Sequence, residues 1–329
     1  MRRLLNIIIA VLGALAIAAA AFAYFLFASF TGAGPLPEDK VVVIPKGTGV
    51  SGIAQLLREE GVIGNADIFK LGVRLFSKDK PLLAGEYVFP KATSPSAAMG
   101  IMIAGKSITH QLTIPEGLTV REVLDLVTAA PLLDWPLPEV KPAEGALLPE
   151  TYQFLRGESR AAVVERMADA MREALAAEWP KRDPDLPLKT IEEAVVLASI
   201  VEKETSKADE RARIAGVFYN RLKKGMPLQS DPTVIFAVTL GKSKLNRGLT
   251  YDDLKIDSPY NTYVVKGLPP GPIANPGLAA LQAVLRPMKH KELYFVADGT
   301  GGHAFAKTLD EHNKNVAAWR KVQKQQTAE

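Results

Sequence analysis

Hydrophobic residues are spread unevenly along the chain, and the most apolar stretch lies near the N-terminus. It runs from Leu4 to Phe30 and is interrupted only by Asn6 and Ser29. About 20 apolar residues suffice to cross a bilayer as a helix, so this stretch predicts a transmembrane segment. Arg2 and Arg3 precede it and no basic residue lies within it. The positive-inside rule therefore predicts a cytoplasmic N-terminus.

This segment could be a cleaved signal peptide or an uncleaved membrane anchor. Its middle, AIAAAAFA, resembles a signal-peptidase site, but the apolar run continues through Tyr24-Phe25-Leu26-Phe27 and is longer than the apolar region of a signal peptide. We favour an uncleaved single-pass anchor in the bacterial inner (cytoplasmic) membrane, with everything after Thr31 outside the cytoplasm. Cleavage is the second interpretation.

The segment after the anchor alternates between strand and helix patterns. Residues 41–44 and 85–89 predict strands, whereas 50–60, 65–76 and 94–104 have helical spacing. Ile114-Pro115-Glu116-Gly117 echoes Ile44-Pro45-Lys46-Gly47, which indicates a weak internal repeat or two independent strand-to-helix turns. The βααβ order resembles a LysM-type carbohydrate-binding module, and a carbohydrate role is an analogy from that resemblance.

The C-terminal half reads as mixed helix and strand. Helices are expected over 159–177, over 209–224 and from Leu309 onward, and residues 294–297 and 303–305 predict a hairpin. The predicted fold is α+β, with a transmembrane helix, a LysM-like βααβ module and a mixed α/β catalytic domain. The predicted parts are the tip and anchor (1–30), a linker (31–40), the LysM-like module (41–108), a repeat-like segment and bridge (109–160) and the catalytic domain (161–329).

One helix carries a carboxyl where an apolar residue is expected. The helix opens with a capping box of Thr190 and Glu193. Leu197, Ile200, Val201 and Glu204 then share one stripe, with Glu202 and Lys203 toward a more polar side. Desolvation of Glu204 would raise its pKa toward that of a general acid. A salt bridge to Lys203 or Arg211, or a frayed helix end, is the alternative.

Several short motifs add to this picture, in the order ASIVEKET, VFYNRL, LQSDPTV, YNTY, GLPPGPIANPG and YFVADGTGGHAF between residues 198 and 305. Together they resemble the endolytic murein (peptidoglycan) lytic transglycosylases of the MltG, or YceG-like, family. The resemblance implies that Glu204, the second glutamate of EKET, is the single catalytic acid and base. It also implies cleavage of the MurNAc-(β1,4)-GlcNAc bond within nascent peptidoglycan glycan strands, giving 1,6-anhydro-MurNAc ends. Penicillin-binding proteins or other cell-wall synthesis machinery are implied as partners.

Further residues are candidates for substrate binding because amides, hydroxyls and aromatic faces suit sugars. They are Asn220, Gln229, Ser230, Asp231, Tyr260, Asn261, Tyr263 and His303. Each has a structural alternative: the tyrosines could be core, the amides could satisfy loop backbone, and for Asn220 we favour an anchor for the loop. Asp231 is expected to cap a helix that begins at Pro232. If Asp231 instead faces Glu204, a two-carboxylate hydrolase becomes possible.

The amino-acid composition excludes several classes of function. The chain has no cysteine, which excludes thiol catalysis and cysteine metal sites, and its net charge of +4 is mild. Nucleic acid is not expected as a partner beyond a membrane. The four histidines have no metal-ligand spacing, so neither metal nor cofactor is expected. A non-catalytic scaffold that tethers the membrane to peptidoglycan is the competing hypothesis.

Overall fold

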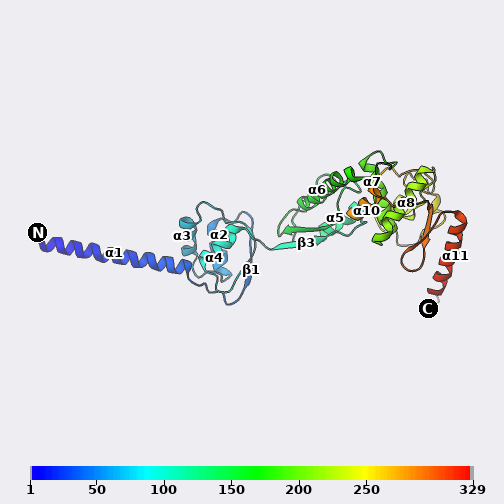
Figure 1. The fold of residues 1–329 in the computed structure, drawn as a ribbon. Coiled ribbons are helices and arrows are strands. Elements are labelled where there is room, and N and C mark those ends of the chain that lie inside the picture. Colours follow the sequence, from blue (N-terminus) through cyan, green and yellow to red (C-terminus); the bar gives the residue numbers. More distant parts are fainter. Residues whose placement is uncertain (1, 327–329) are drawn as a thin grey trace. The chain divides into compact units, whose positions relative to one another are not determined.

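The computed structural model describes residues 2–326, which form two compact units (Figure 1). Among these residues, unit 1 comprises 2–110 and 155–157, and unit 2 comprises 111–154 and 158–326. The described residues contain three separate two-stranded sheets among many helices. This arrangement agrees with the predicted α+β class.

Unit 1 is a small βααβ module with a long helix before it and a short helix after it. Its elements are α1 (Arg2–Thr31), β1 (Lys40–Ile44), α2 (Val50–Glu59), α3 (Ala66–Phe76), β2 (Gly85–Phe89) and α4 (Pro95–Ala104). β1 and β2 pair antiparallel, with Lys40 opposite Phe89 and Ile44 opposite Gly85. The Asn65 side chain caps α3 by accepting from the N–H groups of Asp67 and Ile68, as its sequence position predicts.

β1 buries alternate side chains, as a half-buried sheet does, and β2 follows the same alternation except that Glu86 is buried beside Tyr87. Val42, Ile44, Tyr87 and Phe89 are buried, and they pack in one cluster with residues of α2 and α3. The predicted βααβ order is therefore present. Whether the module is a LysM domain stays a prediction.

Helix α1 is the one helix of residues 2–326 that has the length and apolar composition needed to cross a bilayer. Its last buried residue, Phe30, stacks on Phe76 of α3 with ring centroids 5.5 Å apart. The Phe30 ring also lies over Gly72, where any Cβ would collide with it. The end of α1 is thus part of the hydrophobic core of unit 1.

Unit 2 begins with a strand–helix–strand segment and continues with a helical core. Its elements are β3 (Thr109–Thr113, which begins in unit 1), α5 (Val120–Ala129), β4 (Thr151–Leu155), α6 (Arg160–Glu178), η1 (Trp179–Lys181), α7 (Ile191–Glu204), α8 (Ala208–Lys223), α9 (Asp231–Thr239), η2 (Asp253–Lys255), α10 (Leu278–Leu285), β5 (Tyr294–Ala297), β6 (His303–Ala306) and α11 (Leu309–Gln326). β3 pairs with β4, and β5 with β6 in the predicted hairpin.

Helix α7 is the centre of the unit 2 core. All eight residues from 194 to 201 are buried, so the helix is enclosed on every side rather than along one stripe. It packs against α8 and α10. Thr190 caps it through the N–H of Glu193, but the Glu193 carboxylate accepts from the N–H of Lys189 instead of closing the predicted box on Thr190.

The Gly- and Pro-rich loop at 267–277 is fixed to this core by buried hydrogen bonds. The Ser199 hydroxyl of α7 accepts from the N–H of Ile273 at 3.0 Å. Asn275 is fully buried, accepts from the N–H of Leu147 and donates to the carbonyl of Leu118. Helix α10 begins after Gly277, two residues later than Asn275-Pro276 would suggest.

Candidate active site

Glu204 is the last residue of α7, and its carboxylate reaches the segment before α9. The Ser230 hydroxyl donates to Glu204 Oε1 at 2.5 Å. Among the described residues, no lysine, arginine or histidine forms a salt bridge with Glu204. Lys203 donates instead to the Gly117 carbonyl, and Arg211 pairs with Glu116 and Glu202. The salt-bridge alternative considered for Glu204 is therefore not found.

The surroundings of Glu204 favour its protonated form. Burial raises the pKa of Glu204 to about 7, helped by the negative charge of Asp231 and opposed by the Ser230 hydrogen bond and the positive charge of Arg221. The residue nevertheless keeps partial solvent exposure. A carboxyl that holds its proton near neutral pH and is still accessible can act as a general acid.

Ser230 is held rigidly by two threonines. Its backbone N–H donates to Thr262 Oγ1 at 3.0 Å, and its carbonyl accepts from the Thr233 hydroxyl at 2.6 Å. The two threonine hydroxyls lie 2.8 Å apart. Ser230 is 1% exposed, and both threonines are as buried. This network fixes the donor that faces Glu204.

Asp231 lies beside this donor and has a different role from the predicted cap. It is the first residue of α9, Ser230 occupies the N-cap position, and Ser230 makes no side-chain cap hydrogen bond. The Asp231 carboxylate accepts from the Tyr263 hydroxyl at 2.6 Å. Burial and the neighbouring carboxylates raise the pKa of Tyr263. Asp231 and Tyr263 therefore belong to the surroundings of Glu204, and the prediction of Asp231 as N-cap was wrong.

Glu202 does not point toward a polar side, as the stripe argument expected. Its side chain is 5% exposed, its carboxylate accepts from the Gly277 N–H at 2.9 Å, and Arg211 lies 3.6 Å away. Burial raises the pKa of Glu202 as well. Glu202 thus ties the end of α7 to the start of α10, whereas the Glu204 carboxylate reaches Ser230.

Of the other predicted side chains near this segment, Gln229 is exposed, whereas Tyr260 and Asn261 make contacts within the protein. Gln229 is exposed, has φ of 50° and donates its N–H to the Thr262 carbonyl, so its side chain is available to a ligand. Tyr260 packs on Phe236, with ring centroids 4.8 Å apart. Asn261 is fully buried; its amide donates to the carbonyls of Leu254 and Ile256, and its Oδ1 accepts from the N–H of Tyr263. Asn261 therefore shapes the loop and does not face a cleft.

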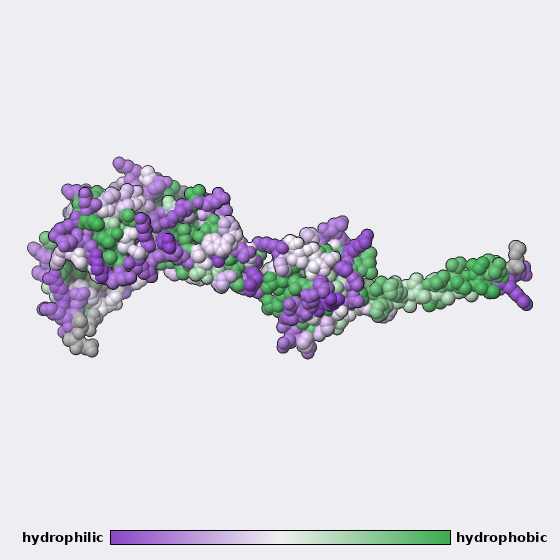
Figure 2. Space-filling view, turned by 180° about the vertical axis from the view of Figure 1, so that it is seen from behind, coloured by the Kyte–Doolittle hydropathy of each residue, from purple (hydrophilic) through white to green (hydrophobic). Residues whose placement is uncertain are grey.

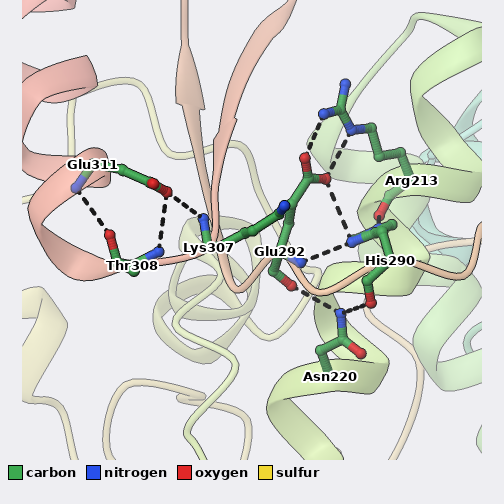
Figure 3. A network of polar contacts seen from close by, with 7 residues as sticks. All are labelled: Arg213, Asn220, His290, Glu292, Lys307, Thr308 and Glu311. Carbon is green, nitrogen blue, oxygen red and sulfur yellow. Dashed lines mark hydrogen bonds and ion pairs between the residues drawn. The ribbon is translucent and has the colours of Figure 1, made fainter.

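Asn220 belongs to a separate polar network (Figure 3). Its amide donates to the carbonyls of His290 and Glu292, both at 2.9 Å, and Arg213 makes two hydrogen bonds to the Glu292 carboxylate. This is the loop anchor that the sequence favoured for Asn220, and these bonds leave the amide nitrogen no further donor.

His303 lies in β6 and is also engaged by the protein. Its ring Nδ1 lies 2.7 Å from Glu210 Oε2, its backbone N–H donates to Glu210 Oε1, and its ring packs edge-on against Phe295. A structural role accounts for these contacts. In the part of the chain that the structure describes, no group of three or more His, Asp or Glu side chains could hold a metal ion.

Three residues at this site were not predicted from the sequence. Thr233 and Thr262 hold Ser230, and Arg221 lies near enough to lower the pKa of Glu204. Arg221 is 7% exposed and donates to the carbonyls of Leu228 and Leu293 at 2.6 Å each. Both threonines and Arg221 lie inside the short motifs, but nothing in the spacing of those motifs showed which residues would meet.

One accessible carboxyl with a raised pKa, faced by a fixed hydroxyl donor, is the arrangement of an acid–base catalyst acting at a loop-lined surface. The sequence profile of the YceG-like family matches residues 42–318. The chain belongs to the YceG-like family.

Relatives agree with this assignment. The chain is 34% identical over 303 residues to the endolytic murein transglycosylase of Bacillus subtilis, covering 82% of each chain. It is 32% identical over 323 residues to that of Streptococcus pneumoniae serotype 2, covering 84% of this chain and 57% of the relative. The crystal structure of a YceG-like protein of Listeria monocytogenes superposes with a TM-score of 0.50 at 33% identity, covering 84% of this chain and 99% of that one.

Proposed function

We propose that the chain is a membrane-anchored lytic transglycosylase that cleaves peptidoglycan glycan strands internally. Two relatives that are 32–34% identical over most of the chain are named endolytic murein transglycosylases, which supports this activity and peptidoglycan as its substrate. The observation that carries the mechanism is the accessible Glu204 carboxyl, with its pKa raised to about 7 by burial.

In the first half of the reaction, Glu204 acts as the general acid. The bond between C1 of MurNAc and O4 of GlcNAc breaks, and the Glu204 proton passes to O4 of the leaving sugar. A carboxyl with an ordinary pKa would be ionised at neutral pH and would have no proton to give. The burial of Glu204 therefore supplies the protonation state that this step needs.

In the second half, Glu204 acts as the general base. The ionised carboxylate takes the proton of the C6 hydroxyl of MurNAc while O6 forms a bond to C1. The product is a 1,6-anhydro-MurNAc end, Glu204 regains its proton, and no water is consumed. One carboxyl performs both steps, unlike the carboxylate pair of most glycosidases.

Ser230 and Asp231 shift the pKa of Glu204 in opposite directions. The Ser230 hydroxyl stabilises the ionised form of Glu204, and the Asp231 charge stabilises the protonated form. The same Asp231 charge would favour the positive charge that develops at C1 when the glycosidic bond breaks. Gln229, which is exposed beside Ser230, is our candidate for a direct sugar contact.

A hydrolase that uses Glu204 with Asp231 is the second candidate. The observation that favours it is that Asp231 lies close enough to Glu204 to raise its pKa. The hydrogen bond from Tyr263 to Asp231 is compatible with either reaction, whereas the relatives named endolytic murein transglycosylases favour the single-carboxyl reaction. A non-catalytic scaffold is disfavoured because a scaffold has no use for a desolvated carboxyl.

The remaining parts of the proposal concern place and partners. Helix α1 would span the inner membrane with the N-terminus in the cytoplasm, leaving the rest of unit 1 and all of unit 2 outside the cytoplasm. The βααβ module of unit 1 would act as a LysM-like glycan-binding module. Penicillin-binding proteins or other cell-wall synthesis enzymes would supply the nascent strands.

The product ends test this function. The full chain in detergent is incubated with uncrosslinked glycan strands in water enriched in ¹⁸O, and products are read by mass spectrometry. We expect anhydro-MurNAc ends without ¹⁸O. New reducing ends, in excess of those in a control without enzyme, would mean a hydrolase, and binding without cleavage would support the scaffold.

A further inference from the structure

Helix α1 is longer than a bilayer requires. Its 30 residues make it about 45 Å long at about 1.5 Å per residue, whereas the hydrocarbon core is about 30 Å thick and takes about 20 residues. Counted from Leu4, the hydrocarbon ends near Ala23 and Tyr24. Figure 2 shows that the apolar surface of α1 covers most of its length. The last turns of α1 therefore lie at the boundary between acyl chains and headgroups.

Tilting would be the usual way to absorb surplus apolar length, but here the end of α1 is attached to protein. Phe30 is 4% exposed and packs on Phe76 and over Gly72 of α3. The surplus turns are thus fixed to α3, and α3 is carried to the same depth as these turns.

The face of α3 beside α1 is apolar and open. Leu71, Leu75 and Phe76 are 39%, 62% and 47% exposed. Between the two helices lies a hollow of about 150 Å³ with almost wholly apolar walls. It is lined by Leu26, Phe27 and Phe30 of α1 and by Leu71, Leu75 and Phe76 of α3. The apolar surface of α1 therefore continues onto α3 without a polar break.

We propose that this α3 face, formed by Leu71, Leu75 and Phe76, lies in the lipid interface and seats unit 1 on the membrane. The inference rests on the proposed membrane anchoring by α1 and adds a second, lateral contact. Exposed apolar side chains at the depth of the acyl boundary are covered by lipid, as in an interfacial amphipathic helix. Arg74 and Lys78 are exposed beside this face, where they can meet lipid phosphates.

The consequence is an orientation for unit 1. A single helix leaves the attached module free to rotate and tilt, whereas a second contact through α3 fixes one side of it toward the bilayer. The β1–β2 sheet, which Figure 1 places on the side of unit 1 away from α1, then faces the cell wall.

Measurements of depth in a bilayer test the proposed contact between α3 and lipid. Because the chain has no cysteine, a single cysteine can be introduced and labelled at each chosen position. The full chain is reconstituted in nanodiscs of anionic and zwitterionic phospholipid with one cysteine at a time: Leu12→Cys in α1, Leu75→Cys in α3 and Val43→Cys in β1. Each carries an environment-sensitive fluorophore, and quenching is recorded with two spin-labelled lipids, one labelled high in the acyl chain, which reports on Leu75 and Val43, and one labelled near the end of the acyl chain, which reports on Leu12. Val43 is the matched control, an apolar residue that is 39% exposed.

We expect blue-shifted emission and strong lipid quenching at Leu75, and neither at Val43. Quenching at Leu12 but not at Leu75 would overturn the proposed contact between α3 and lipid, while still supporting membrane anchoring by α1. A blue shift at Leu75 without lipid quenching would mean that protein, such as a second copy, covers the face, and would also overturn the proposal. Loss of quenching at Leu12 would instead refute the proposed anchoring.

Discussion

Replacing Glu204 by glutamine tests whether burial controls its protonation. The pKa of Glu204 is raised from 4.5 to about 7 in the folded protein, and each pKa unit corresponds to about 1.4 kcal/mol. Folded wild type binds one more proton than unfolded chain between these two values, so its stability falls as pH rises through that window. Below pH 4.5 Glu204 does not lower the free energy of unfolding. Above about pH 7 it lowers the free energy of unfolding by about 3 kcal/mol.

Glu204→Gln cannot ionise and keeps an oxygen that can accept from Ser230. The difference in unfolding free energy between variant and wild type should therefore grow by about 3 kcal/mol from pH 4 to pH 8 in favour of the variant. For a unit of this size that corresponds to roughly 6 to 12 °C in Tm. Thermal unfolding of both proteins across this pH range, in the same detergent, measures it. A difference that does not change with pH would refute the reasoning, because other titrating groups cancel between the two proteins.

The neighbours of Glu204 give further expectations. Ser230→Ala removes a bond that favours the carboxylate, so the pH profile of glycan cleavage should move to higher pH, with a loss of about tenfold in rate; an unmoved profile would contradict this. Asp231→Asn removes a negative charge, so the profile should move to lower pH while the products keep anhydro ends; loss of all activity with intact folding would favour the hydrolase. Asn220→Ala leaves the carbonyls of residues 290 and 292 without their donor and should cost about 1–3 kcal/mol of stability, read by denaturant unfolding, with unchanged product type.

The sequence pattern predicted elements well wherever local signals are strong. The cap at Asn65, the strand from Gly85 to Phe89 and the hairpin near the C-terminus lie where residue type and alternation place them. These features depend on neighbouring residues in the chain. Helix α7 and its Thr190 cap were predicted, but the single apolar stripe was wrong, because residues 194–201 are buried on all sides.

The site was predictable only in part, because it depends on contacts across long sequence separations. The helical stripe separated Glu204 from Glu202, but it placed Glu202 toward a polar side, whereas the Glu202 side chain is 5% exposed. The partners of the two residues are tertiary: Glu202 has Arg211 and the Gly277 N–H, and Glu204 has Ser230. Residue type suggested that several side-chain amides would contact sugar. Two of them, Asn220 and Asn261, instead donate their N–H groups to backbone carbonyls.

Release of anhydro-MurNAc ends from purified sacculi, by wild type and by Glu204→Gln, tests the central claim most directly. Glu173→Gln, an exposed glutamate on α6, serves as the matched control. The account predicts that anhydro ends appear with wild type and with Glu173→Gln and disappear with Glu204→Gln, while all three proteins bind the glycan. Anhydro ends produced by Glu204→Gln at the wild-type rate would contradict the assignment of Glu204 as the acid and base.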